Sequence, residues 1–124
     1  MRKSIAVVDD DEIYKIIIGK MISNSGLFDK VYLFEDSRNA LKVLSNGDIS
    51  SPEIILLDLN MPHLDGWEFL DHLKEHNPEV YFEAEIYIVT SSISQNDQAQ
   101  ASSYKEIKGF ISKPVTTKFL QEIA

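Results

Sequence analysis

The sequence predicts one α/β domain, built on an open five-stranded parallel sheet with helices on both faces. The main observation is that short apolar runs alternate with segments of helical periodicity along the whole chain. This alternation is typical of strand–helix units in a parallel sheet. The second observation is the length of 124 residues, which favours a single domain over residues 1–124 and an open sheet over a barrel.

The composition argues against several classes of function. With 44% hydrophobic residues, the chain can form a substantial core. Its formal net charge of −8 argues against direct binding to nucleic acids or anionic membranes. The absence of cysteine excludes disulfides and thiolate metal sites. No apolar stretch reaches the length of a membrane span, and we expect a cytoplasmic protein.

Two strand–helix units are expected in the first half of the chain. Residues 5–8 form a buried strand that ends at three aspartates, and one of these acids can cap the following helix. The expected core face of this helix carries Ile13, Ile16, Ile17 and Met21. Residues 31–34 form the second strand. The helix after it should end at Gly47.

Three further units complete the predicted sheet. Residues 54–57 are four apolar residues in a row, as expected of a strand buried on both faces. The helix after Gly66 stops before Pro78. The remaining elements are a strand at 86–89, a polar and weakly periodic helix at 95–104, a strand at 109–112 and a last helix from Thr116 or Thr117.

Polar residues with matching chemistry follow four of the five strands. They are Asp9, Asp10, Asp58, Thr90 and Lys113. Each has an ordinary explanation on its own, such as a helix cap, a strand residue or a turn. In a parallel sheet, however, the strand ends lie on one edge, where open α/β sheets bind their ligands. The convergence of all five residues therefore predicts a functional site.

The three carboxylates require a cation. Two like charges about 4 Å apart repel by roughly 4 kcal/mol at an effective dielectric constant of about 20. A site with only oxygen ligands suits a hard ion such as Mg²⁺, which binds through one or two carboxylates plus phosphate. Asp58 is then a candidate nucleophile that forms an acyl phosphate, and Lys113 and Thr90 are candidates to contact the phosphoryl oxygens.

Four sequence blocks resemble the signature blocks of response-regulator receiver domains of two-component signalling. They are IAVVDD from Ile5, LLDLNMPHLDG from Leu56, IVTSS from Ile88 and FISKP from Phe110. The blocks occur in order and cover essentially the whole chain. The resemblance implies the flavodoxin-like (βα)5 fold with strand order 2-1-3-4-5, which agrees with the alternation described above.

The resemblance also implies a role for each site residue. Asp58 would be the phosphoacceptor. Asp10, Asp58 and the backbone carbonyl of Asn60 would bind Mg²⁺ directly, and Asp9 would bind it through water. Thr90 and Lys113 would contact the phosphoryl group. The other implied roles are backbone contacts to phosphate from Leu59 and Ser91, a switch formed by Thr90 and Phe110, and a cis peptide before Pro114.

The expected function is that of a stand-alone receiver, which accepts a phosphoryl group from a histidine kinase or phosphotransfer protein. It would catalyse its own phosphorylation and dephosphorylation without being a turnover enzyme, and it would bind an unknown downstream protein as a monomer or weak dimer. One alternative is a small Mg²⁺-dependent phosphatase of the haloacid-dehalogenase type, with Asp9 and Asp11 as nucleophile and acid. Another is a receiver-like binding module that is never phosphorylated. The sequence leaves the kinase, the target and the lifetime of the phosphorylated state open.

Overall fold

A computed structural model describes residues 2–46, 51–91 and 94–124, and in this part of the chain five parallel strands form one sheet. The strand order is β2-β1-β3-β4-β5, so the predicted fold class and topology are confirmed. The strands are β1 (Lys3–Val8), β2 (Phe28–Phe34), β3 (Ile54–Leu57), β4 (Glu85–Thr90) and β5 (Ile107–Ser112).

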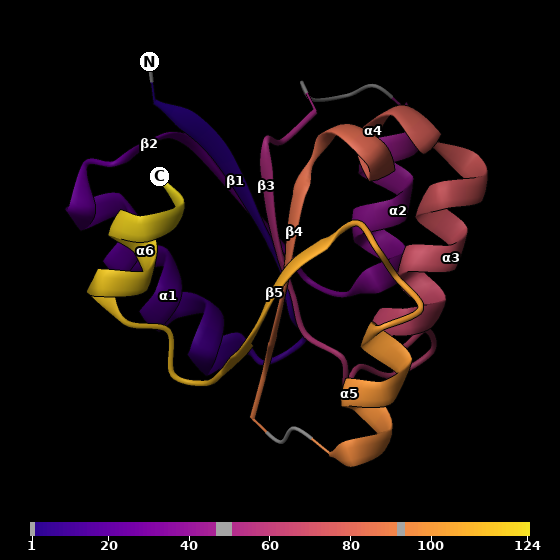
Figure 1. The fold of residues 1–124 in the computed structure, drawn as a ribbon. Coiled ribbons are helices and arrows are strands. Elements are labelled where there is room, and N and C mark those ends of the chain that lie inside the picture. Colours follow the sequence, from indigo (N-terminus) through magenta and orange to yellow (C-terminus); the bar gives the residue numbers. More distant parts are fainter. Residues whose placement is uncertain (1, 47–50, 92–93) are drawn as a thin grey trace.

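Helices cover both faces of the sheet. Figure 1 shows α1 and α6 on one face, and α2, α3, α4 and α5 on the other. Their bounds are α1 (Glu12–Ser25), α2 (Ser37–Asn46), α3 (Gly66–His76), α4 (Pro78–Glu83), α5 (Gln95–Ala101) and α6 (Thr117–Ile123). The predicted end of α2 at Gly47 lies outside the described residues. None of the helices in the described ranges combines the length and the apolar character needed to cross a membrane.

Strand β3, at the centre of the sheet, is buried on both faces, as its continuous apolar run predicts. All four residues of β3 are at most 2% exposed. Alternate residues enter different cores: Ile55 and Leu57 belong to the cluster under α2 and α3, whereas Ile54 and Leu56 belong to the cluster under α1 and α6. This double burial fixes where β3 ends, and therefore where Asp58 begins the loop that follows.

The predicted core face of α1 is wrong except at Met21, which is half-buried and packs against the core. Ile13, Ile16 and Ile17 are 73%, 56% and 56% exposed. The buried residues of α1 are Lys15, Ile18, Gly19 and Ile22. Both sets have helical spacing, and the buried set contains a lysine, which is why it is hard to recognise. The buried Lys15 ammonium has two hydrogen-bond partners. It donates to Glu12 at 2.9 Å and to the Phe34 carbonyl at 3.4 Å.

The chain has one helix beyond the predicted repeat. The sequence before β4 contains α4 (Pro78–Glu83), with Pro78 at its start, where the missing N–H costs no hydrogen bond. Tyr81 anchors α4 in the core at 1% exposure and donates its hydroxyl to Glu106 at 2.9 Å. The polar α5 is shorter than predicted and ends at Ala101.

Candidate functional site

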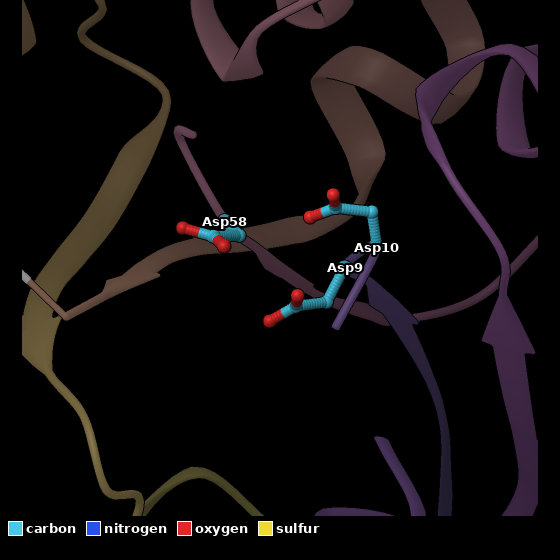
Figure 2. A group of neighbouring side chains, drawn as sticks. All are labelled: Asp9, Asp10 and Asp58. Carbon is cyan, nitrogen blue, oxygen red and sulfur yellow. The ribbon is translucent and has the colours of Figure 1, made fainter. Parts of the chain in front are cut away.

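Asp9, Asp10 and Asp58 converge at the carboxyl edge of the sheet, and Figure 2 shows their side chains reaching toward a shared space. Val8 and Leu57 are paired in register between β1 and β3, so the residues that follow them are neighbours. One carboxylate oxygen from each aspartate lies within 4.8 Å of the others. Asp9 and Asp58 are buried, whereas Asp10 is exposed.

Lys113 partly neutralises this acidic cluster. Its Nζ lies 2.8 Å from Oδ2 of Asp9 and 3.3 Å from Oδ2 of Asp58. Burial alone would lower the pKa of Lys113, but the hydrogen bond to Asp9 and the charge of Asp58 outweigh it and raise the pKa above its ordinary value. One ammonium opposes three carboxylates, so the site keeps an excess of negative charge.

The surroundings of the Asp58 carboxyl raise its pKa. Burial raises its pKa above the ordinary value, and the charge of Asp9 raises it further, while Lys113 and the Asn60 backbone act in the opposite direction. The Asn60 N–H donates to Oδ1 of Asp58 at 3.3 Å. Asp9 is held by the Asp11 N–H, which donates to its Oδ1 at 2.9 Å. Both buried carboxylates are therefore oriented by backbone donors.

The remaining predicted residues lie around this cluster. Thr90 is fully buried at the end of β4, and its Oγ1 accepts a hydrogen bond from the Asn60 side chain at 3.4 Å. Its carbonyl accepts from the Lys113 N–H at 2.8 Å. Leu59 is buried and Ser91 is exposed. The peptide bond between Lys113 and Pro114 is cis, as the resemblance implies.

Phe110 lies on the edge strand β5, paired in register with Ile88. Its side chain is half-buried and packs against the core cluster under α2 and α3. The position therefore has one side against the core and one side toward solvent, and both the switch role and the ordinary core role remain compatible with it.

Two residues at the site were given no role by the sequence. A β-carbon at Gly66 would lie 2.7 Å from the Asp58 carbonyl oxygen and 2.9 Å from Cα of Leu59, so only glycine lets α3 begin this close to the loop after β3. The second is Tyr14, whose ring centroid lies 4.2 Å from Nζ of Lys113. The glycine after an aspartate helix cap was a usable signal; the position of Tyr14 depends on the packing of α1.

The alternative phosphatase mechanism finds no support. It requires Asp11 as an acid beside Asp9. Instead, Asp11 is exposed and caps α1, where its carboxylate accepts the Tyr14 N–H at 3.0 Å. Asp58, which that mechanism leaves without a role, lies at the centre of the cluster and contacts Lys113.

The donor set of the cluster fits a hard divalent cation. The three aspartates of the cluster offer carboxylate oxygens, which are ligands that Mg²⁺ and Ca²⁺ prefer. Two of the three acids are buried, and uncompensated buried charges are costly. A bound cation would offset the charge of Asp9, which adds to the effect of burial in raising the pKa of Asp58.

Comparisons with known proteins agree with this geometry. Among curated relatives, a probable methanogenesis regulatory protein of Methanothrix harundinacea is 27% identical over 94% of this chain and 76% of its own length. A protein-glutamate methylesterase/protein-glutamine glutaminase of Treponema pallidum is 28% identical over 90% of this chain. The chain spans only 26% of that enzyme's length.

Solved structures show the same fold. A two-component response regulator from Cytophaga hutchinsonii superimposes with a TM-score of 0.88 at 25% identity, covering 99% of this chain and 95% of the other. The receiver domain of a sensor histidine kinase from Pseudomonas aeruginosa superimposes with a TM-score of 0.80 at 22% identity, covering 99% and 94%. That structure has a magnesium ion coordinated in its active site cleft.

The family model described as the response regulator receiver domain matches residues 5–124. This range contains all five strands except the first two residues of β1, and it includes every residue of the acidic cluster. Receiver domains accept a phosphoryl group on an aspartate in two-component signalling, and they bind Mg²⁺ in an acidic pocket. The chain therefore belongs to the response regulator receiver domain family.

Proposed function

We propose that Asp58 is the phosphoacceptor of this chain, and that residues 1–124 form one receiver domain that works as a phosphorylation switch. The observation that carries the proposal is the environment of Asp58. It is a buried carboxylate at the carboxyl end of a central strand, with Lys113 at 3.3 Å and two further aspartates beside it. A nucleophile in this position meets the phosphoryl group together with its counter-charges.

The proposed chemistry is an in-line transfer from a phosphohistidine. An oxygen of ionised Asp58 attacks phosphorus, and the P–O bond forms as the P–N bond to the donor imidazole breaks. The imidazole nitrogen keeps the electron pair and takes up a proton. Lys113 and the Thr90 hydroxyl bind the phosphoryl oxygens, and backbone N–H groups of Leu59 and Ser91 complete the contacts.

We assign the metal site to Asp10, Asp58 and the backbone carbonyl of Asn60, with Asp9 bound through water. When bound, Mg²⁺ supplies charge neutralisation at the transferred phosphoryl group. The support is the oxygen-only donor set and the excess negative charge at the cluster. The magnesium ion in the cleft of the Pseudomonas aeruginosa receiver supports the same choice of metal.

The proposed output is a change at the β4–β5 edge of the sheet. Phosphorylation replaces the single negative charge of ionised Asp58 with a phosphoryl group that carries about −1.5 to −2 charges, and this group attracts the Thr90 hydroxyl. Movement of this fully buried side chain leaves space beside β5, and Phe110 turns inward to fill it. The new surface binds the downstream protein. The chain acts through this binding and not as a turnover enzyme.

The phosphodonor is proposed to be a histidine kinase or phosphotransfer protein that docks on α1. The helix begins immediately after the acidic cluster, and its Ile13, Ile16 and Ile17 are exposed. A protein that brings a phosphohistidine to Asp58 must cover the rim of the site, and this apolar stripe offers it area to bury. The cytoplasmic location and a monomeric or weakly dimeric state remain predictions.

The phosphoacceptor is tested by intact mass after incubation with acetyl phosphate, with and without Mg²⁺. The parent chain is expected to gain one phosphoryl group only when Mg²⁺ is present. Asp58→Asn should gain none, whereas Asp11→Asn, which changes an acid outside the cluster, should remain competent. An adduct that persists in Asp58→Asn would overturn the assignment.

The docking surface is tested by comparing Ile16→Ser with Phe82→Ser. Both side chains are 56% exposed, but Phe82 lies on α4, on the other face of the sheet. With a histidine kinase that phosphorylates the parent chain, transfer to Ile16→Ser should slow by at least tenfold, which corresponds to about 1.4 kcal/mol. Phe82→Ser should transfer normally, and both variants should react normally with acetyl phosphate. Equal transfer to both variants would place the kinase elsewhere.

A further inference from the structure

Lys113 has a third neighbour besides its two carboxylates. The face of the Tyr14 ring lies over its ammonium, with Nζ 4.2 Å from the ring centroid. This distance is well inside the range of about 6 Å in which a cation is attracted to an aromatic face. Tyr14 comes from the first turn of α1, whereas Lys113 follows β5, so the contact joins two segments that are far apart in the sequence.

The backbone of Tyr14 is fixed by the same segment that supplies the acids. The Asp11 carboxylate accepts the Tyr14 N–H at 3.0 Å and caps α1. Asp11 is itself tied to Asp9 by its N–H, at 2.9 Å. The ring is therefore held at a defined place relative to Asp9, the nearest partner of Lys113.

The Tyr14 hydroxyl has no comparable role. It is buried beside the main chain of Val115 without a hydrogen bond of normal geometry to any described residue. Burial is the main reason that the pKa of Tyr14 rises to about 12. A tyrosine selected for its hydroxyl would donate it to a partner. The ring, and not the hydroxyl, is the part of Tyr14 that meets the site.

We propose that Tyr14 is a positioning residue for Lys113, and that its ring face holds the ammonium at the phosphoacceptor while the charges of the site change. Of the three neighbours of Lys113, Tyr14 alone is neutral. Phosphorylation converts the Asp58 carboxylate into an acyl phosphate, and a bound metal competes for Asp9. The attraction of the ring is unaffected by either event, so the ammonium stays in place to meet a phosphoryl oxygen.

Without the ring, the Lys113 side chain would have one open side. A lysine has a long, flexible stem, and holding it in one conformation costs side-chain entropy. The side chain of Lys113 is only 14% exposed, and Tyr14 is one of the groups that shield it. Loss of the ring should therefore lower the rate of the chemical step more than it changes binding of the small donor.

The experiment varies the charge distribution of the ring while keeping its shape. Tyr14→Phe is compared with chains that carry phenylalanine analogues of increasing ring fluorination at position 14, which weakens the attraction to a cation stepwise. The readout is the rate of Asp58 phosphorylation by acetyl phosphate at saturating Mg²⁺, as a function of donor concentration. Tyr14→Phe should stay within about twofold of the parent, since the hydroxyl is not used. The maximal rate should then fall with each fluorine, to about tenfold in total, with the half-saturating donor concentration unchanged.

The inference rests on the proposed function, and the outcomes separate the two. If the parent is not phosphorylated, or if Asp58→Asn still is, the proposed function fails. If the parent reacts and the fluorinated series shows a constant rate, only the role of Tyr14 is overturned. A Tyr14→Phe chain slower by tenfold or more would also overturn it, because it would assign the effect to the hydroxyl. Tyr32→Phe, in a half-buried tyrosine on β2, serves as the control for changing a tyrosine elsewhere.

Discussion

A β-carbon added to Gly66 would lie 2.7 Å from the main-chain oxygen of Asp58. The contact is with backbone, which cannot swing aside as the end of a flexible side chain can. The start of α3 and the loop that carries the phosphoacceptor are thus packed against each other at the closest distance that any residue type allows.

Gly66→Ala is expected to damage both stability and the site. Relief of the overlap must shift the backbone after β3, at a cost of about 1–3 kcal/mol in the free energy of unfolding. The same shift moves Asp58, so phosphorylation by acetyl phosphate should slow. Gly26→Ala is the matched control, because Gly26 has a φ of 67° with nothing within 4 Å of the added carbon. It should lose about 1 kcal/mol while the phosphorylation rate of the folded protein stays normal.

Asp58→Asn is expected to stabilise the chain at neutral pH. The pKa of Asp58 is raised mainly by burial and then by the charge of Asp9, so ionisation of this carboxyl is less favourable in the folded state than in the unfolded state. This contribution to stability is fully present below the unfolded pKa, and it is lost as the pH rises through the folded pKa. At pH 7 and without Mg²⁺, the free energy of unfolding of the variant should be higher than that of the parent. Urea titrations from pH 3.5 to 7 should show the difference growing with pH; a constant difference would contradict the stated cause.

Magnesium is expected to raise the melting temperature of the parent chain. A ligand that binds only the folded state adds about 2.7 kcal/mol at a hundred times its dissociation constant. Asp10→Asn should remove most of this gain, because Asp10 belongs to the acidic cluster. Asp71→Asn, an acid on α3, should retain it. Equal stabilisation of both variants by Mg²⁺ would place the metal elsewhere.

Tyr104→Leu is expected to loosen α5 selectively. The helix has no buried residue, and it is attached near its ends to Trp67. The Trp67 ring stacks on Tyr104 at 5.0 Å between centroids, and its Nε1 lies 3.4 Å from Oδ1 of Asp97. Loss of an aromatic pair is worth about 0.5–1.5 kcal/mol, so amide hydrogen exchange in residues 95–101 should accelerate about threefold to tenfold.

The control for this experiment is Tyr87→Leu. Tyr87 packs edge-on against Phe119, with 5.5 Å between ring centroids, and both are partly buried and pack against the core cluster under α1 and α6. Its removal should lower global stability and leave the exchange of α5 relative to the rest of the chain unchanged. Acceleration of α5 in both variants would show that Trp67 is not its anchor.

Predictions from the sequence were correct where a local pattern was compatible with only one structure. The run at 54–57 could only be a strand buried on both faces, and the acids, threonine and lysine at the strand ends followed from parallel topology. The prediction failed for α1, where isoleucines at several positions allow two apolar faces, and the correct face contains Lys15. A buried lysine becomes acceptable only once the Phe34 carbonyl and Glu12 are placed beside it.

Other features depend on contacts between distant parts of the chain. The Tyr14 ring meets Lys113 only because α1 and the segment after β5 cover the same face of the sheet. The extra helix α4 was not predicted, and its anchor, the contact of Tyr81 with Glu106, joins residues far apart in sequence. Local periodicity carries no information about such pairs.

The absence of buried side chains in α5 has a consequence for the energetics of signalling. A two-state equilibrium needs about 5.5 kcal/mol of differential binding to move from 1:99 to 99:1. Most helices of a domain would add the loss of their own core burial to that sum. Because α5 has no buried residue, its displacement would withdraw almost no apolar area from the core, so moving α5 adds little to that sum.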